Sequence, residues 1–197
     1  MKRQFGKTLQ HIAALTLGVL LTLGPAAQAA LNTGTGDVAG DGAALANSND
    51  FDLSSSGALT LVKTAFQTVS GAQLSSTDTV PAGTSVDFMI YLNNESSVAI
   101  NDVSIQDVLN AAFTYQAGTI KIDNSVADCG ASCTPAQEQA VYAAAILTAA
   151  LTDTVDLLDT ASNTGVNIDA GNENVANGLL NVAANTVLAL VFTVVVP

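Results

Sequence analysis

Residues 81–109 read PAGTSVDFMIYLNNESSVAINDVSIQDVL, and their hydrophobic pattern decides the fold class. Val86, Phe88 and Ile90 occupy every second position before the polar break NNESS, and a second segment rich in β-branched residues follows the break. Alternation with a period of two is typical of a strand that is buried on one face. The stretch therefore predicts two strands joined by a turn.

Comparable segments lie on both sides of this stretch. ALTLVKTAF (58–66) and FTYQAGTIKIDN (113–124) are short, β-rich and bounded by turn-forming residues. The final segment, NTVLALVFTVVVP (185–197), is apolar at nearly every position, which predicts a strand covered on both faces. Five or more strands at this spacing predict an all-β fold, a sandwich of the immunoglobulin-like kind.

One helix is predicted inside the sandwich. Thr134-Pro135-Ala136-Gln137 has the pattern of a capping box with proline at the first helical position, and an Ala-rich run follows it. We expect a helical insertion over about 134–151.

The N-terminus has the pattern of a secretory signal peptide. Three basic residues lie within the first seven positions, an apolar run covers 12–24, and the small-residue site Ala27-Gln28-Ala29 follows. We expect residues 1–29 to be removed and the protein to be secreted, either extracellular or at the cell surface. About 168 residues then remain, enough for one domain with an extension.

The extension is residues 30–57, which are rich in Gly, Ser, Asn and Asp and poor in apolar residues. They predict an N-terminal arm that precedes a domain over 58–197. Phe51 and Leu53 alternate with polar residues, as in a short strand that adds to the edge of a sheet. The candidate assembly residues of this arm are Ala43, Leu45, Phe51 and Leu53.

Charge excludes some classes of partner. Without residues 1–29 the chain keeps Lys63 and Lys121 against 17 acidic residues, so its formal charge is 2 − 17 = −15. Such a chain cannot form the basic groove that nucleic acids require, and its final apolar run is too short to span a membrane. Only 11% of the whole chain is charged, against roughly 25% in ordinary soluble domains. A surface with so few charges is poorly protected against association, so either the protein associates with other copies or its acidity alone keeps it soluble as a stable monomer.

The residue inventory argues against an enzyme. The only histidine, His11, lies in the signal peptide, so catalysis would have to use Lys63 or Lys121. Neither lysine has the sequence context of a Ser-Lys catalytic pair.

Cys129 and Cys133 are predicted to form a disulfide after export, which would close the loop before the helix. Zinc would need more ligands than two thiolates, and the spacing differs from that of C-x-x-C redox motifs.

Several acidic turns could bind calcium, although none has a complete calcium-loop spacing, and solvated turns are the ordinary interpretation. No other cofactor is predicted. The candidate residues are Asp37 and Asp41, then Asp153, Asp156 and Asp159, then Asp169 and Glu173.

Lys63 raises a further possibility. Extracellular immunoglobulin-like domains sometimes join a lysine to an asparagine through an isopeptide bond, and Asn181 and Asn185 precede the last strand. The ordinary alternative is a lysine at a sheet edge whose amine reaches solvent.

Four segments together resemble a known family: ALTLVKT, VPAGTSVDFMIYLNN, SVAINDVSIQDVL and FTYQAGTIKID. They are similar to the conserved repeat domain of bacterial and archaeal surface proteins catalogued as domain of unknown function eleven. The resemblance implies an immunoglobulin-like structural module outside the cell, without catalytic residues. A departure is Leu109-Asn110, where the family commonly has Leu-Pro. The residues that match the family pattern are Lys63, Thr64, Ala82, Gly83, Tyr91, Asn93 or Asn94, and Asp107.

A weaker likeness, in LNNESSVAINDV, is to secreted biofilm-fibre subunits of bacilli, which polymerise by inserting an N-terminal strand into the next subunit. With one predicted domain and no anchor motif, we expect a subunit that self-assembles into an extracellular filament or surface layer. Its arm, around 43–53, would add a strand to a neighbouring copy. The alternative is a monomeric cell-surface adhesin or a module that binds glycan or calcium.

Overall fold

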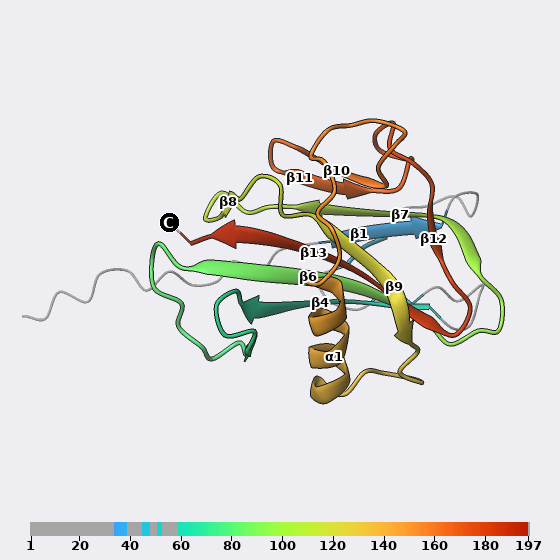
Figure 1. Cartoon of the computed structure of the whole chain (residues 1–197), viewed down its shortest axis with the longest axis horizontal. Coiled ribbons are helices and arrows are strands. Elements are labelled where there is room, and N and C mark those ends of the chain that lie inside the picture. The colour runs from blue at the N-terminus through green and yellow to red at the C-terminus, as the bar shows by residue number, and fades with distance from the viewer. Residues whose placement is uncertain (1–33, 39–44, 48–50, 53–58, 197) are drawn as a thin grey trace, which may run out of the picture.

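The computed structural model describes residues 34–38, 45–47, 51–52 and 59–196, and it shows an all-β sandwich with one short helix (Figure 1). The predicted signal peptide, residues 1–29, lies outside the described residues. The elements are β1 (Gly34–Val38), β2 (Leu45–Asn47), β3 (Phe51–Asp52), β4 (Leu59–Gln67), β5 (Gln73–Leu74), β6 (Ser85–Asn94), β7 (Ile100–Val108), β8 (Thr114–Tyr115), β9 (Lys121–Ala127), α1 (Pro135–Ala145), β10 (Ala161–Thr164), β11 (Asn167–Ala170), β12 (Leu180–Val182) and β13 (Thr186–Val195).

The strands form two antiparallel sheets. Sheet A has the order β10-β11-β7-β1-β2, and β12 also pairs with β7. Sheet B has the order β3-β4-β6-β13-β8, with β5 on β4 and β9 on β13. β6 and β7 lie in different sheets, so the NNESS break is a connection between sheets rather than a hairpin.

The main core lies between the two sheets. Its side chains come from alternate positions of the long strands, as the period-two pattern predicts. Sheet B contributes Leu61, Ile90 and Phe192 among others, and sheet A contributes Val103 and Ile105.

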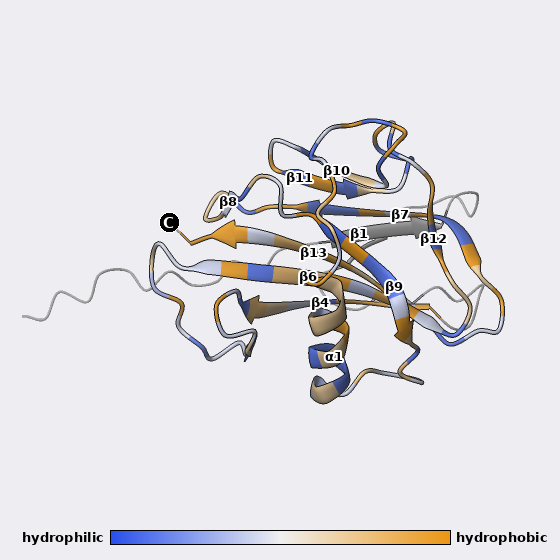
Figure 2. Ribbon diagram, viewed as in Figure 1, coloured by the Kyte–Doolittle hydropathy of each residue, from blue (hydrophilic) through white to orange (hydrophobic). Residues whose placement is uncertain are grey.

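A second, smaller core lies on the outer face of sheet B, beneath α1. Met89 of β6 and Val187 and Val191 of β13 pack there with Val141 and Tyr142 of the helix. Hydrophobic residues recur along β13 (Figure 2). They belong alternately to the two cores and are buried at 187–194, so the predicted double burial of the last strand is confirmed.

The helix begins as predicted and ends earlier. Thr134 is the N-cap, its side chain and that of Gln137 form the capping box, and Pro135 opens the helix. The expected extent to about 151 is wrong, because the helix ends at Ala145. The ammonium of Lys121 donates to the carbonyl of Ile146, and the main chain of Leu151 donates to that of Ile120. The end of the Ala-rich run is thus held by β9 and the residues before it.

The two asparagines of the NNESS break are strand residues. Asn93 and Asn94 end β6 and are almost fully buried. Asn93 accepts from the backbone of Cys129 and donates to that of Gly130, while Asn94 donates to the carbonyls of Val98 and Ala183. Asn94 also accepts from the backbone of Ser96 two residues later, which is an Asx-turn, so a turn role is confirmed for Asn94. Asn93 instead holds the loop at Cys129 and Gly130 against the strand.

Candidate functional site

The described parts of the N-terminal arm add strands to the edges of both sheets. β1 pairs antiparallel with β7 over its whole length, with Gly34, Gly36 and Val38 opposite Asp107, Ile105 and Val103. In addition, β2 pairs with β1, and β3 pairs with two residues of β4. Five consecutive arm residues thus pair with β7, a strand that contributes Val103 and Ile105 to the main core.

β7 depends on the arm for one of its two edges. Its other edge is covered by β11 over Val108–Ile105 and by β12 near Val103 and Ile100. Without β1, the backbone groups between Val103 and Asp107 would form an open sheet edge. Open edges are templates for pairing with a strand from another chain.

The candidate assembly residues are only partly placed. Leu45 lies in β2 opposite Gly36, and Phe51 lies in β3 opposite Leu61. Ala43 and Leu53 lie outside the described residues. Sequence reasoning missed the longest paired segment, 34–38, because GTGDV has no apolar alternation and its strand is defined by main-chain pairing with β7.

A buried ion pair joins the two sheets. Lys63 of β4 places its Nζ 2.6 Å from Oδ2 of Asp107 in β7, with side chains that are 8% and 0% exposed. The rings of Phe88 and Phe192 lie 4.5 and 5.9 Å from Nζ. Burial lowers the pKa of Lys63 and raises the pKa of Asp107, while their mutual attraction opposes both shifts.

Both sequence interpretations of Lys63 are corrected by this pair. The amine faces the interior instead of reaching solvent at an edge. Lys63 is paired with Asp107 rather than with either proposed asparagine, and the side chain of Asn181 accepts a hydrogen bond from the backbone of Asp102. Lys63 and Asp107 both belong to the family-like pattern, but sequence spacing gave no sign that they meet.

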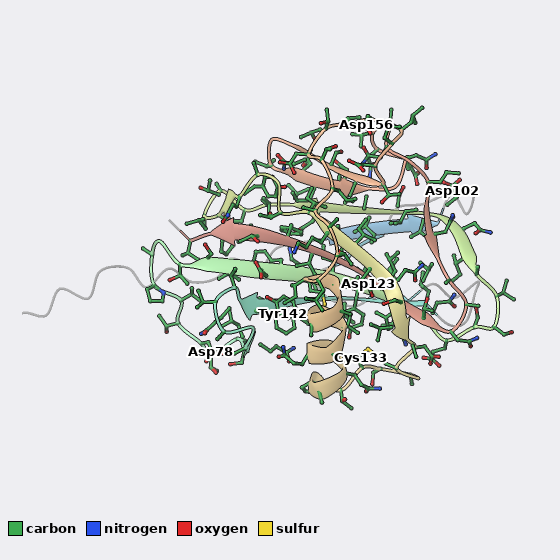
Figure 3. All side chains as sticks on the ribbon, viewed as in Figure 1. Asp78, Asp102, Asp123, Cys133, Tyr142 and Asp156 are labelled. Carbon is green, nitrogen blue, oxygen red and sulfur yellow. A yellow bond between two sulfur atoms is a disulfide. The ribbon has the colours of Figure 1, made fainter. Side chains whose placement is uncertain are left out.

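The outer face of sheet B carries a different polar network, in which hydroxyls donate to carboxylates. Tyr142 of α1, labelled in Figure 3, donates to Asp87 over 2.6 Å. Thr68 and Thr193 donate to the same carboxylate. Tyr91 donates to Glu138 over 2.9 Å. Burial and the neighbouring Asp87 raise the pKa of Tyr142 above its usual value. These contacts fasten the helix to the sheet.

The predicted cysteine pair lies at disulfide distance. Cys129 and Cys133 have Cα atoms 4.8 Å apart, and both pack against the core beneath the helix. Cys133 is seen beside the start of α1 in Figure 3. The bridge closes the loop whose backbone is held by Asn93.

The acidic turns are engaged with donors of the chain itself. Asp153 accepts from the phenol of Tyr115, and Asp159 accepts from Thr152. Asp156, labelled at the top of Figure 3, accepts from the backbone two and three residues later. Within residues 59–196 and the three short arm strands, no group of three or more His, Cys, Asp or Glu side chains could hold a metal ion.

The structure also places most of the other acidic residues that were candidates for binding calcium. Asp169 accepts from the side chain of Gln106, and the backbone of Glu173 donates to Ser104. Asp37 lies in β1, and Asp41 lies outside the described residues. The calcium hypothesis stays a prediction.

No helix in the described part of the chain combines the length and the apolar character that a membrane crossing requires. In comparisons with known proteins, no family model, no curated protein and no solved structure matches this chain. The resemblance to the surface-protein repeat therefore stays a prediction.

Proposed function

We propose that this protein is a secreted structural subunit that self-assembles into an extracellular filament or surface layer. Assembly would occur by β-strand addition, in which the N-terminal arm of one copy pairs with β7 of the next. No catalysis is part of the proposal.

The observation that carries the proposal is the pairing of β1 with β7. The five residues Gly34–Val38 are joined in sequence to the domain only through the rest of the arm, yet they pair with β7 over their whole length and form part of sheet A. The same register is available to the arm of a second copy. Exchange of an identical strand between copies preserves the hydrogen bonds of the donor site, so it costs little free energy.

Surface chemistry supports the same proposal. Only 11% of the residues are charged, and charged side chains on edge strands are a common means of preventing edge pairing. When exchange is head-to-tail, each copy donates one strand and accepts another, so the contact propagates as a fibre.

A pair of cysteines at matched positions tests which copy supplies the strand. Thr35 lies opposite Gln106 in the register of β1 and β7. We expect the double variant Thr35→Cys/Gln106→Cys to form filaments visible by electron microscopy. After oxidation these should give a ladder of covalent oligomers on a denaturing gel without reductant, because each new disulfide joins two copies.

The matched control is Thr35→Cys/Val108→Cys, which is out of register by two residues at an exposed position and should give no ladder. Filaments whose new disulfide lies within one chain would contradict strand exchange. A monodisperse particle at high concentration would contradict assembly altogether and favour the monomeric adhesin or binding module.

A further inference from the structure

The ion pair between the sheets brings together the two groups from which an amide forms, an amine and a carboxyl group. A primary amine, Lys63 Nζ, lies 2.6 Å from one oxygen of a carboxyl group, Asp107 Oδ2, and the two residues are 44 positions apart on facing sheets. The other oxygen, Oδ1, is buried and has no hydrogen-bond partner among the described residues. A carboxylate held for its charge alone normally has both oxygens satisfied.

The surroundings favour the uncharged forms of both groups. Burial lowers the pKa of Lys63 and raises the pKa of Asp107, so transfer of a proton from the ammonium to the carboxylate is made easier. The Lys63 side chain is only 8% exposed, so little water reaches the amine, and this burial outweighs the cation–π attraction of the Phe88 and Phe192 rings for the ammonium. The transfer produces a free amine, which is a nucleophile, beside a carboxylic acid.

We propose that Lys63 and Asp107 condense to an intramolecular amide that joins β4 to β7. The Nζ lone pair adds to Cγ of Asp107 and forms the N–C bond. A proton passes from Nζ to the protonated Oδ2, the Cγ–Oδ2 bond breaks, and one water molecule leaves. Oδ1 becomes the carbonyl oxygen of the amide, and no oxidant, reductant or co-reactant is consumed.

Two physical effects drive the condensation. The fold holds the groups in contact, and well-oriented intramolecular reactions reach effective molarities of about 10⁵–10⁸ M. Two buried charges are also expensive to keep out of water, so their replacement by a neutral amide removes that cost. The released water escapes to bulk solvent, which favours the forward direction in a dry interior.

Lys121 is an internal control for the reaction. Its ammonium donates to the backbone carbonyl of Ile146, and it has no salt bridge among the described residues. The geometry therefore allows condensation at Lys63 and at no other described lysine.

Intact mass of the purified, reduced and denatured mature protein tests the proposal. We expect a mass one water molecule below that of the mature sequence, and a branched peptide joining Lys63 to Asp107 after digestion. Lys121→Arg should keep the loss of water. Lys63→Arg should abolish it, since a guanidinium keeps the charge but cannot serve as the amine.

A mature protein with the full sequence mass overturns the proposal. A loss of water that persists in Lys63→Arg overturns it as well, because dehydration must then lie at another residue. Loss of ammonia instead of water would identify an asparagine as the partner and would also contradict it. Since the branched peptide is sought in the unmodified chain, the test does not depend on the folding of any variant.

Discussion

A buried carboxylate lies against each face of sheet B, Asp87 of β6 on the outer face and Asp107 of β7 in sheet A on the inner face, and the two have different partners. On the outer face, Asp87 accepts from three hydroxyls, at distances of 2.6 to 2.8 Å. On the inner face, Asp107 is opposed by the single amine of Lys63, and one of its oxygens has no hydrogen-bond partner among the described residues. Neutral hydroxyls can satisfy a buried carboxylate without a second charge, whereas the inner pair carries the desolvation cost of two charges.

The Asp87 network holds the helix on the sheet, whereas the pair of Lys63 and Asp107 brings two groups together that can react. The outer network lies between α1 and sheet B, and its donors come from the helix, from β13 and from the residue after β4. The inner pair lies between the two sheets and opposite the arm, because Asp107 pairs with Gly34 of β1. Departure of the arm would therefore open the backbone of the same residue that holds Lys63.

The largest expected effect comes from breaking the inner pair at one end. Lys63→Met leaves Asp107 buried without a counter-charge, which typically costs about 3–5 kcal/mol. Addition of Asp107→Leu removes that charge, so the double variant should have a free energy of unfolding higher by about that amount than the single variant. Urea unfolding at neutral pH measures the difference.

The comparison is made between the two variants, so it holds whether the parent chain carries an ion pair or an amide. A double variant no more stable than Lys63→Met would show that Asp107 reaches water or another donor. The equivalent substitution, Lys121→Met, should lower the free energy of unfolding by less. The ammonium of Lys121 donates to a backbone carbonyl, so its removal leaves no buried carboxylate without a counter-charge.

Sequence patterns predicted the features that depend on neighbours along the chain. Alternation located β4 and β6, double-sided apolarity predicted the burial of β13, and Thr134 with Gln137 located the start of the helix. These features arise from the side-chain period of a strand and from capping within four residues.

Sequence patterns did not predict the features that depend on how the strands are arranged in the two sheets. The contact between Lys63 and Asp107 crosses from one sheet to the other, and nothing in a spacing of 44 residues specifies it. The strand Gly34–Val38 has no apolar pattern and is defined by the backbone of β7. Residues 161–182 supply β10, β11 and β12, of which two pair with β7, and the hydrophobic pattern of the sequence did not predict these strands.

A smaller effect is expected on the outer face. Tyr142→Phe removes one of the three donors to Asp87 and keeps the ring that stacks on Phe66 at a centroid distance of 4.0 Å. Hydrogen bonds to charged groups contribute about 1.5–3 kcal/mol, so the free energy of unfolding should fall by that amount or less, since two hydroxyls remain. An unchanged unfolding midpoint in urea would mean that Thr68 and Thr193 suffice.

The smallest effect is the dependence of that difference on pH. The raised pKa of Tyr142 means that the unfolded chain loses the phenol proton first, near its ordinary value of 10.0. The stabilisation by Tyr142 is thus complete below about pH 10 and is lost as the pH rises towards the folded-state pKa, by at most about 1.4 kcal/mol for each pH unit. Urea unfolding of the parent chain and of Tyr142→Phe, compared between about pH 8 and about pH 11, should show the gap narrowing only above about pH 10. Other titrating groups are common to both chains and cancel, so a gap that stays constant would mean that the phenol ionises equally in the folded and unfolded states and that the outer network does not hold its proton.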